Sequence, residues 1–342
     1  MMRRVLVLLS ATLLGAQSPA TVDAQDLSRL FQQVRSSVVI IKAAGREVDA
    51  GGEMRFNETG SGVLIASGGL VMTAAHVVQS MDEVHVEFVG GESVAAHVVA
   101  SEPAADLSLL QLDHVPQGAQ VAVLADSNTV HVGEQAIVVG APYGLSYSMS
   151  AGWISARWAP NTVYRKMPLA EFFQTTATIN QGNSGGPMFN MAGEVIGLVS
   201  HNITKSGGSE GLGFVVTINT AKQLLLERRS FWSGLDGEIL SGAVAGLLNL
   251  PPGAGYLIKS VARGSPADKA GLRGGNRLAT IDGRQLVLGG DIVLTIEGIP
   301  VNSVENLIKI RVRLAQLKPG SPFKSTILRA GRTLEVTVHT IE

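Results

Sequence analysis

The sequence of 342 residues contains no cysteine, which excludes disulfide bonds, zinc sites built from thiolates and a thiol nucleophile. Charged residues make up only 16% of the chain and the formal net charge is −1. No basic surface for nucleic acid is therefore predicted. The seven histidines include no closely spaced pair of the kind that binds a metal ion.

Glycine and apolar residues are abundant by contrast. The chain has 40 glycines, and 45% of its residues are hydrophobic. This composition is typical of short strands joined by turns rather than of long solvated helices or disorder. The length predicts two or three compact units, and we expect a mostly β protein.

The N-terminus has the pattern of a secretory signal peptide. Arg3 and Arg4 precede an apolar run of roughly a dozen residues, which ends in small residues before Gln25. Such a run is shorter than the ~20 residues that span a bilayer. We predict a signal peptide at residues 1–24, a periplasmic or secreted protein and no stable membrane span. The alternative is a retained N-terminal anchor with the chain facing the periplasm.

The segment GNSGGP at residues 182–187 surrounds Ser184 with glycines. Glycine allows backbone angles and close approaches that a Cβ atom prevents, so the hydroxyl and nearby N–H groups can face one small space. We predict that Ser184 is a nucleophile beside an oxyanion hole at Gly182, Asn183 and Ser184, with the N–H groups of Gly182 and Ser184 as donors. Taken alone, the segment could also be a turn between strands.

A serine nucleophile needs a base, and the base needs a carboxylate that holds its tautomer. His76 follows an apolar strand and small residues in the segment TAAHVV. Asp106 heads the apolar strand DLSLLQL, where it could reach Nδ1 of His76. We predict these two residues as base and orienting acid. The remaining histidines are expected to be packed or surface residues: His85, His97, His114, His131, His201 and His339.

The segments TAAHVV, DLSLLQL and GNSGGP, in the order His, Asp, Ser, resemble the HtrA (Deg) family of trypsin-like serine proteases. The resemblance covers the chain from about residue 27 to its end. It implies a mostly β fold, namely a chymotrypsin-like double β-barrel protease followed by a small α+β PDZ domain. The implied boundaries are a signal peptide at 1–24, a protease domain at 25–229, a linker at 230–237 and a PDZ domain at 238–342. We expect a single PDZ domain, as in the single-PDZ members of the family.

Three stretches of the protease region carry further expectations. Residues 44–59 are polar and Gly-rich and are predicted to form a loop, and residues 121–124 are predicted to form a strand. GLGF at 211–214 copies a PDZ signature, but its place after the nucleophile predicts the last strand of the second barrel. Apolar residues at helical spacing predict a helix over 26–35, which packs on the barrels or, as the family implies, makes trimer contacts.

The string SPADKAGL and the order of elements after residue 238 resemble a PDZ domain in the permuted form found in HtrA proteins. The resemblance implies that N–H groups of Gly255, Tyr256, Leu257 and Ile258 bind a peptide carboxylate, while the edge of their strand pairs with the peptide. The helix that begins at Ser303 would form the other wall of the groove. The alternative is a generic α+β domain that only packs on the protease.

The resemblance also implies which residues line the pocket for the substrate residue before the cleaved bond. In this sequence their side chains are apolar or neutral. The positions are Ile179, Val199, Ser200, His201, Asn202 and Ile203. We therefore expect cleavage after small or medium aliphatic residues such as Val or Ala.

The resemblance implies a serine endopeptidase of envelope protein quality control, active under stress, with a PDZ domain that binds peptide C-termini and regulates cleavage. Its partners would be unfolded or misfolded polypeptides, peptide C-termini and two further copies of the chain in a homotrimer, with no nucleic acid and no cofactor. The alternative is a PDZ-dependent peptide sensor or chaperone whose protease body is dormant.

Overall fold

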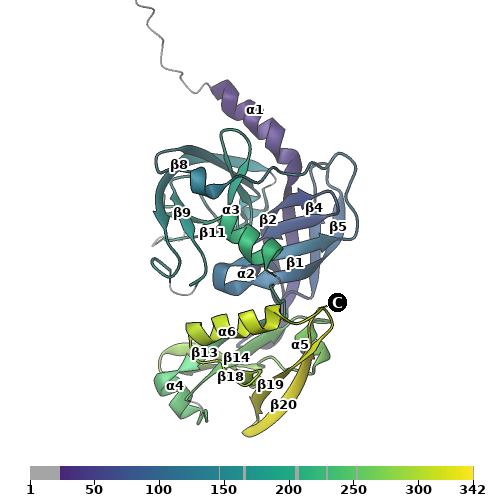
Figure 1. Ribbon diagram of the computed structural model, residues 1–342, viewed down its shortest axis with the longest axis vertical. Coiled ribbons are helices and arrows are strands. Elements are labelled where there is room, and N and C mark those ends of the chain that lie inside the picture. The colour runs from purple at the N-terminus through teal and green to yellow at the C-terminus, as the bar shows by residue number, and fades with distance from the viewer. Residues whose placement is uncertain are drawn as a thin grey trace, which may run out of the picture.

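A computed structural model of the protein describes residues 24–145, 147–164, 167–204, 208–228, 230–251 and 253–341. Two β-barrels with a helix above them stand over a smaller domain built on a third sheet (Figure 1). This architecture confirms the expected mostly β fold of a double barrel followed by a small α+β domain. The predicted signal peptide lies outside the described residues, except for its last position.

The first barrel closes in the order β1-β2-β3-β6-β5-β4. Its inward side chains are mostly Val, Leu and Ile. In β4 the valines at 84 and 86 are buried, while Glu83 and His85 are exposed. The strands are β1 (Val38–Asp49), β2 (Gly52–Ala66), β3 (Leu70–Thr73), β4 (Glu83–Glu87), β5 (Ser93–Glu102) and β6 (Leu107–Leu112).

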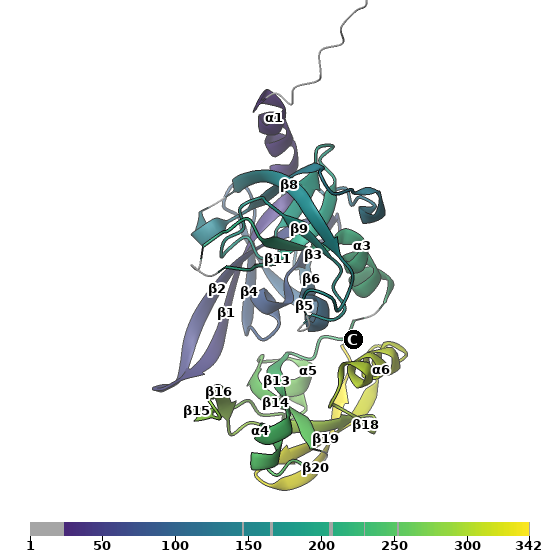
Figure 2. The same ribbon diagram turned by 90° about the vertical axis from the view of Figure 1, so that its left-hand side faces the viewer.

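The predicted loop at residues 44–59 is wrong, because these residues form the outer half of the β1–β2 hairpin. They pair from Ala44 with Asn57 to Asp49 with Gly52, whose φ of 115° suits the turn. The hairpin projects beyond the barrel toward the C-terminal domain (Figure 2). Neither face of its strands is buried as a barrel strand would be, so the sequence shows no alternation of apolar and polar residues there.

The second barrel closes in the order β10-β11-β12-β9-β8-β7. Gly213 and Phe214 open β12, which pairs with β9 and β11, so the GLGF stretch belongs to the barrel as predicted. The strand predicted at 121–124 is reduced to one bridge between Leu124 and Val195. The strands are β7 (Gln135–Gly140), β8 (Ser148–Trp158), β9 (Phe172–Thr175), β10 (Pro187–Asn190), β11 (Val195–Asn202) and β12 (Gly213–Thr217).

The helical elements of the protease region are short, apart from α1 (Ala24–Val34). Leu30 and Val34 of α1 are buried in the core shared by the two barrels, and Phe31 packs against it. None of the helices in the described part of the chain combines the length and apolarity needed to cross a membrane. The other elements are η1 (Arg35–Ser37), α2 (Ala75–Val78), η2 (Pro103–Ala105), η3 (Ser127–Thr129), η4 (Pro142–Gly144), α3 (Ile218–Ala221) and the π-type η5 (Lys222–Glu227).

The C-terminal domain has a sheet in the order β13-β14-β17-β19-β20, with β18 beside β17 and a separate β15–β16 hairpin. Ser303 accepts a hydrogen bond from the Asn306 N–H and so caps α6. The strands are β13 (Leu235–Ser241), β14 (Ala254–Val261), β15 (Arg277–Ile281), β16 (Arg284–Leu288), β17 (Ile292–Ile296), β18 (Ile299–Pro300), β19 (Pro322–Arg329) and β20 (Arg332–His339); the helices are α4 (Gly242–Leu247), α5 (Pro266–Lys269) and α6 (Val304–Ala315).

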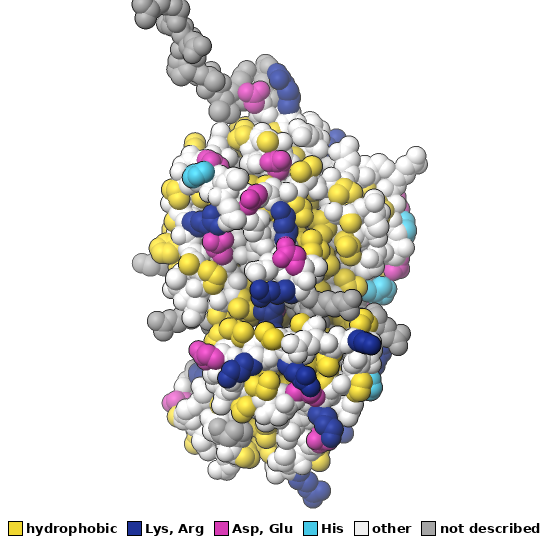
Figure 3. All heavy atoms as spheres, viewed as in Figure 1, with side chains coloured by type: hydrophobic (Ala, Val, Ile, Leu, Met, Phe, Trp, Pro, Cys, Tyr) yellow, Lys and Arg dark blue, Asp and Glu magenta, His cyan; other side chains and the backbone are white. Residues whose placement is uncertain are grey.

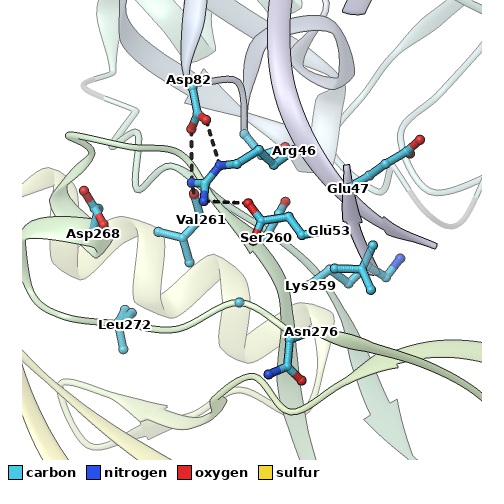
Figure 4. A pocket seen from close by; sticks show the side chains of 14 residues that line it. Arg46, Glu47, Glu53, Asp82, Lys259, Ser260, Val261, Asp268, Leu272 and Asn276 are labelled. Carbon is cyan, nitrogen blue, oxygen red and sulfur yellow. Dashed lines mark hydrogen bonds and ion pairs between the residues drawn. The ribbon is translucent and has the colours of Figure 1, made fainter. Parts of the chain in front are cut away.

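The β1–β2 hairpin is tied to the C-terminal domain by a polar cluster around a cavity of about 220 Å³ (Figure 4). Arg46 Nε lies 2.8 Å from Asp82 Oδ2, and Arg46 Nη1 lies 3.0 Å from Glu53 Oε1. From the other domain, the Val261 carbonyl accepts from Arg46 at 3.4 Å, and the Arg263 N–H donates to Asp82 at 2.8 Å. The two domains are therefore joined by hydrogen bonds.

Candidate active site

His76 lies in the first turn of α2, and Asp106 directly follows η2. His76 Nδ1 lies 2.9 Å from Oδ1 and 3.0 Å from Oδ2 of Asp106, and the His76 backbone N–H donates to Oδ1 at 3.1 Å. Asp106 is only 3% exposed and has a left-handed φ of 55° at the end of η2. Aspartate tolerates this conformation better than most residues. The shared proton therefore sits on Nδ1, and Nε2 of His76 is left as a proton acceptor.

Ser184 lies in the turn before β10, and its two flanking glycines are required by close contacts. Gly182 and Gly185 have φ values of 98° and 78°. A Cβ atom at Gly182 would lie 2.2 Å from the Ala141 carbonyl oxygen, and one at Gly185 would lie 2.2 Å from Thr73 Oγ1. The glycine pattern of the segment thus reflects a backbone that no other residue could adopt there.

Ser61 fixes the turn from the first barrel. Its N–H donates to the Ser184 carbonyl at 2.8 Å, and its hydroxyl donates to the Gly182 carbonyl at 2.7 Å. Ser61 did not stand out in the sequence, although it lies in a Gly-Ser-Gly segment at 60–62. It positions the nucleophile turn without being part of the chemistry.

The Ser184 hydroxyl is directed at a backbone carbonyl in this structure. Its Oγ donates to the Ser200 carbonyl at 3.5 Å, and among the described residues no hydrogen bond joins Ser184 to His76. A Ser184–His76 bond requires rotation of the Ser184 side chain or a shift of the His76 ring, whose side chain is 46% exposed. Such bonds commonly form only in the complex with substrate.

The three residues predicted for the oxyanion hole differ in how their N–H groups are used. The Asn183 N–H donates to the Asn180 carbonyl at 3.0 Å, so it is not available to a ligand. Within the described ranges, the N–H groups of Gly182 and Ser184 donate to no protein acceptor. The two donors that an oxyanion would need are therefore free, and Asn183 contributes to the shape of the turn.

Two residues predicted for the specificity pocket lie together beside β12. Ile179 is buried, and a Cβ atom at Gly213 would lie 2.5 Å from its Cδ1. Asn202 Nδ2 donates to the Ile179 carbonyl at 3.1 Å. Ile203 follows at the surface and is 43% exposed.

The other predicted pocket residues face the interior. Val199 is fully buried in the core of the second barrel, and its carbonyl accepts the Gly185 N–H at 2.7 Å. The Ser200 hydroxyl donates to Asp106 Oδ2 at 2.5 Å. It adds a third donor to a carboxylate that already accepts two from His76. The sequence indicated Ser200 as a pocket residue and missed this contact with Asp106.

The predicted carboxylate-binding strand has no free edge. Tyr256 pairs with β13 on one side and with Val293 of β17 on the other, and Leu257 is likewise paired on both sides. Gly255 pairs with β13, and the Ile258 N–H donates to the Asp291 carbonyl at 3.0 Å. The expectation of a peptide added to this strand is therefore wrong. The sequence assigned the first three residues of β13 to a linker, and β13 forms one edge of the sheet.

A largely apolar cavity of about 870 Å³ lies between α6, the C-terminal sheet and the protease region. Figure 3 shows apolar and basic side chains side by side along the seam between the two domains. From the C-terminal domain the lining includes Phe231, Leu235, Tyr256, Leu307 and Ile308, and from the protease region it includes Glu102, Pro103, Ala104, Pro168 and Leu169. The space beside α6 is thus open to a ligand and faces the protease.

Within the described residues, no group of three His, Asp or Glu side chains is placed to bind a metal ion.

The chain matches two family models in sequence order. The trypsin-like peptidase domain matches residues 60–198, and the PDZ domain matches residues 227–340. The periplasmic pH-dependent serine endoprotease DegQ of Escherichia coli (strain K12) is 33% identical over 290 residues, which are 83% of this chain. This chain belongs to the HtrA family.

Further comparisons agree with this HtrA assignment. A probable periplasmic serine endoprotease DegP-like of Hahella chejuensis (strain KCTC 2396) is 34% identical over 251 residues, or 70% of this chain. The solved structure of the HtrA-type protease AlgW with tripeptide has a TM-score of 0.53 and 25% identity, and covers 92% of this chain and 96% of its own. The chain spans 59% of the length of DegQ and 52% of the Hahella relative, less than two thirds of either.

In this HtrA chain, two elements of the PDZ domain that line the space beside α6 contact the protease. α6 contacts the segment that carries Asp106, and β13 contacts the segment that carries His76. Arg311 of α6 forms an ion pair with Glu102, which is 4% exposed and lies four residues before Asp106. Burial raises the pKa of Glu102 to about 6, against the opposing charge of Arg311.

The second of these contacts involves Gln79, three residues after His76. The Gln79 side chain donates to the Leu235 carbonyl at the start of β13, and the Trp232 indole donates to the Gln79 carbonyl at 2.8 Å. The segments that carry His76 and Asp106 therefore each contact the PDZ domain.

The environment of His76 predicts the acid limb of the pH profile. Partial burial lowers the pKa of His76, but the charge of Asp106 and the hydrogen bond to it outweigh this, so the pKa lies above its ordinary value of 6.5. A base with a raised pKa stays protonated to higher pH, so activity is lost as pH falls through that raised value. We expect kcat/KM for a peptide substrate, measured against pH, to rise with a midpoint above 6.5. A midpoint at or below 6.5 would contradict this.

Proposed function

We propose that this HtrA protein is a serine endopeptidase in which Ser184 attacks a peptide carbonyl, His76 accepts the serine proton and Asp106 orients His76. The observation that carries the proposal is the bond of His76 Nδ1 to both oxygens of the buried Asp106 carboxylate. That contact fixes the tautomer in which Nε2 can take a proton, and it stabilises the imidazolium that results.

The remaining steps use groups already described. The free N–H groups of Gly182 and Ser184 stabilise the tetrahedral oxyanion. His76 then gives its proton to the leaving amine. In the second half of the reaction His76 takes a proton from the attacking water and returns it to Ser184 as the acyl-enzyme is hydrolysed. No cofactor takes part.

The substrates we propose are unfolded or misfolded proteins of the cell envelope, cleaved after small or medium aliphatic residues. None of the residues Ile179, Val199, Ser200, His201, Asn202 and Ile203 is acidic, so none attracts a Lys or Arg side chain. The names of the relatives, which are periplasmic serine endoproteases, support a location in the periplasm after removal of the signal peptide. We further propose a homotrimer.

The PDZ domain is proposed to bind peptide C-termini in the space beside α6 and to regulate cleavage. β13 is an edge strand of the sheet, and an extended peptide adds to an exposed edge through main-chain hydrogen bonds. The contacts of Gln79 and Arg311 with the walls of this space give a bound peptide a route to both His76 and Asp106.

The test is hydrolysis of unfolded casein by protein that begins at residue 25, with and without short peptides that end in apolar residues. We expect cleavage, stimulation by the peptides, and product ends mapped by mass spectrometry after Val or Ala. Labelling of Ser184 by a fluorophosphonate reports the nucleophile without any substrate preference. A preference for cleavage after Lys or Arg would overturn the proposed specificity.

A second candidate function is a peptide sensor or chaperone with a dormant protease body. The orientation of the Ser184 hydroxyl toward the Ser200 carbonyl favours it. In this case neither casein cleavage nor fluorophosphonate labelling occurs with any peptide, while the protein still binds the peptides and suppresses aggregation of unfolded substrate. Light scattering measures that suppression.

A further inference from the structure

A bulge in β11 brings two neighbouring side chains to the same side of the strand. Successive side chains of a regular strand point to opposite faces. The pairing of β11 with β12 shifts register between Val199 and His201, which leaves Ser200 as the extra residue. Ser200 Oγ consequently lies 3.1 Å from His201 Nδ1 while it also lies 2.5 Å from Asp106 Oδ2.

The single proton of the Ser200 hydroxyl decides the direction of these bonds. An ionised carboxylate only accepts hydrogen bonds, so Ser200 donates its proton to Asp106. The contact with His201 must then use a lone pair of Ser200 Oγ, and His201 Nδ1–H is the donor. Nε2 of His201 carries no proton in this neutral tautomer, and it is buried without a partner in the described part of the chain.

Aromatic rings hold the His201 imidazole in place. It stacks on Phe214 with centroids 5.1 Å apart and planes 10° apart, and Tyr164 and Phe172 pack against it at 4.4 Å and 5.5 Å. Burial lowers the pKa of His201, opposed by the charge of Asp106, while His76 lowers it further. The ring is therefore neutral near pH 7, as the donor assignment requires. The titratable groups that face it among the described residues are Asp106, His76 and Tyr164.

We propose that His201 is a positioning residue for the Asp106–His76 pair and acts through the Ser200 hydroxyl. This inference rests on the proposed endopeptidase function. The chain of donors runs from His201 Nδ1–H to Ser200, from Ser200 to Asp106 Oδ2, and from His76 to the same carboxylate. His201 Nδ1–H donates to a lone pair of Ser200 Oγ, and this bond keeps the Ser200 proton directed at Asp106 Oδ2.

Loss of this donor frees the Ser200 hydroxyl to rotate. Among the described residues, its lone pairs then have no donor, and Met167 Sδ at 3.7 Å is a weak alternative acceptor for its proton. Asp106 Oδ2 would be left buried with one donor fewer, and the carboxylate would hold His76 less firmly. The cost is that of one neutral hydrogen bond, which corresponds to about a three- to tenfold change in rate.

Two amide replacements separate the donor from the size and polarity of the ring. His201→Asn places an amide N–H near the position of Nδ1, whereas His201→Gln places it near the position of Nε2. We expect kcat on a peptide substrate to fall about fivefold in H201Q with KM changed less than twofold, and H201N to keep most of the wild-type kcat. His201→Phe keeps the stack on Phe214 without a donor and should resemble H201Q. His85→Phe, on the exposed side of β4, is the control and should change nothing.

A coupling test and an activity-free readout complete the design. In a Ser200→Ala background, replacement of His201 should have no further effect on kcat, because the two residues act in series. The rate at which the His76 Nδ1 proton exchanges with water is followed by its downfield NMR signal. This rate should rise in H201Q and H201F and stay near wild type in H201N. This measurement needs no turnover, so it reports on His201 even if the protein cleaves nothing.

Several results would overturn the inference. Equal kcat in H201Q and wild type, equal loss in H201N and H201Q, an effect on KM alone, or additive losses with Ser200→Ala would each do so. Thermal unfolding of every variant identifies a loss of fold. If one of H201N, H201Q and H201F does not fold, the other two variants test the inference. Failure of the proposed function is a separate result: wild type then neither labels with fluorophosphonate nor cleaves casein, while the NMR comparison of His201 variants still stands.

Discussion

Replacement of Ser184 with Ala is expected to lower kcat on unfolded casein about 10⁶-fold, the loss typical of removing a serine nucleophile. The substitution deletes only Oγ, whose contact in the structure is a long hydrogen bond to the Ser200 carbonyl. The turn around it is held by the backbone bonds of Ser61 and Gly185. The protein should therefore keep its fold and its melting temperature, and kcat is measured from the release of soluble peptides.

Ser155→Ala is the matched control, since Ser155 lies exposed on β8 and forms no hydrogen bond with His76, Asp106 or Ser184 among the described residues. It should leave both hydrolysis and fluorophosphonate labelling unchanged. Residual cleavage by S184A at more than about 1% of the wild-type rate would point to another nucleophile or to a contaminating protease, given the magnitude expected.

Asp106→Asn is expected to lower kcat about 10⁴-fold with little change in KM. The asparagine amide would turn an N–H group toward His76 Nδ1, which then becomes an acceptor, and the His76 proton would move to Nε2. That tautomer cannot take a proton from Ser184. The His76 backbone N–H donates to Oδ1 and the Ser200 hydroxyl donates to Oδ2. The remaining oxygen therefore keeps one of these donors, and the geometry is largely kept.

The chain provides a second Asp–His pair as a control for this substitution. His97 Nε2 lies 3.2 Å from Asp113 Oδ1 at the surface, with both side chains more than half exposed. Asp113→Asn should not alter kcat or KM. If Asp106→Asn were as active as Asp113→Asn, the proposed role of Asp106 would be wrong. Steady-state kinetics at saturating peptide decides between these results.

The sequence predicted the architecture because its strongest signals are local. GNSGGP, TAAHVV and DLSLLQL each combine a functional residue with a backbone requirement or an apolar strand, so each could be read from a few neighbouring residues. The structure places His76 and Asp106 in contact, and Ser61 of the first barrel holds the turn that carries Ser184. The chemical roles of these residues stay predictions until the variants are measured.

What the sequence did not predict depends on contacts between distant segments. The outer β1–β2 hairpin and β13 are strands because their backbones pair, although their side chains lack a clear alternation. The contact of Ser200 with Asp106 arises from a one-residue bulge, which shifts every later side chain to the opposite face. No local pattern marks such a bulge before the pairing partner is known.

The contacts of Gln79 and Arg311 connect the PDZ domain to the protease site, and any coupling of binding between two sites acts equally in both directions. If a peptide at the PDZ domain raises the affinity of the protease for a substrate analogue by some factor, the analogue must raise the affinity for the peptide by the same factor. An occupied active site is then itself an effector of the PDZ domain. A long unfolded chain that reaches both sites at once would gain this coupling within a single molecule, in addition to the high effective concentration of its second binding segment.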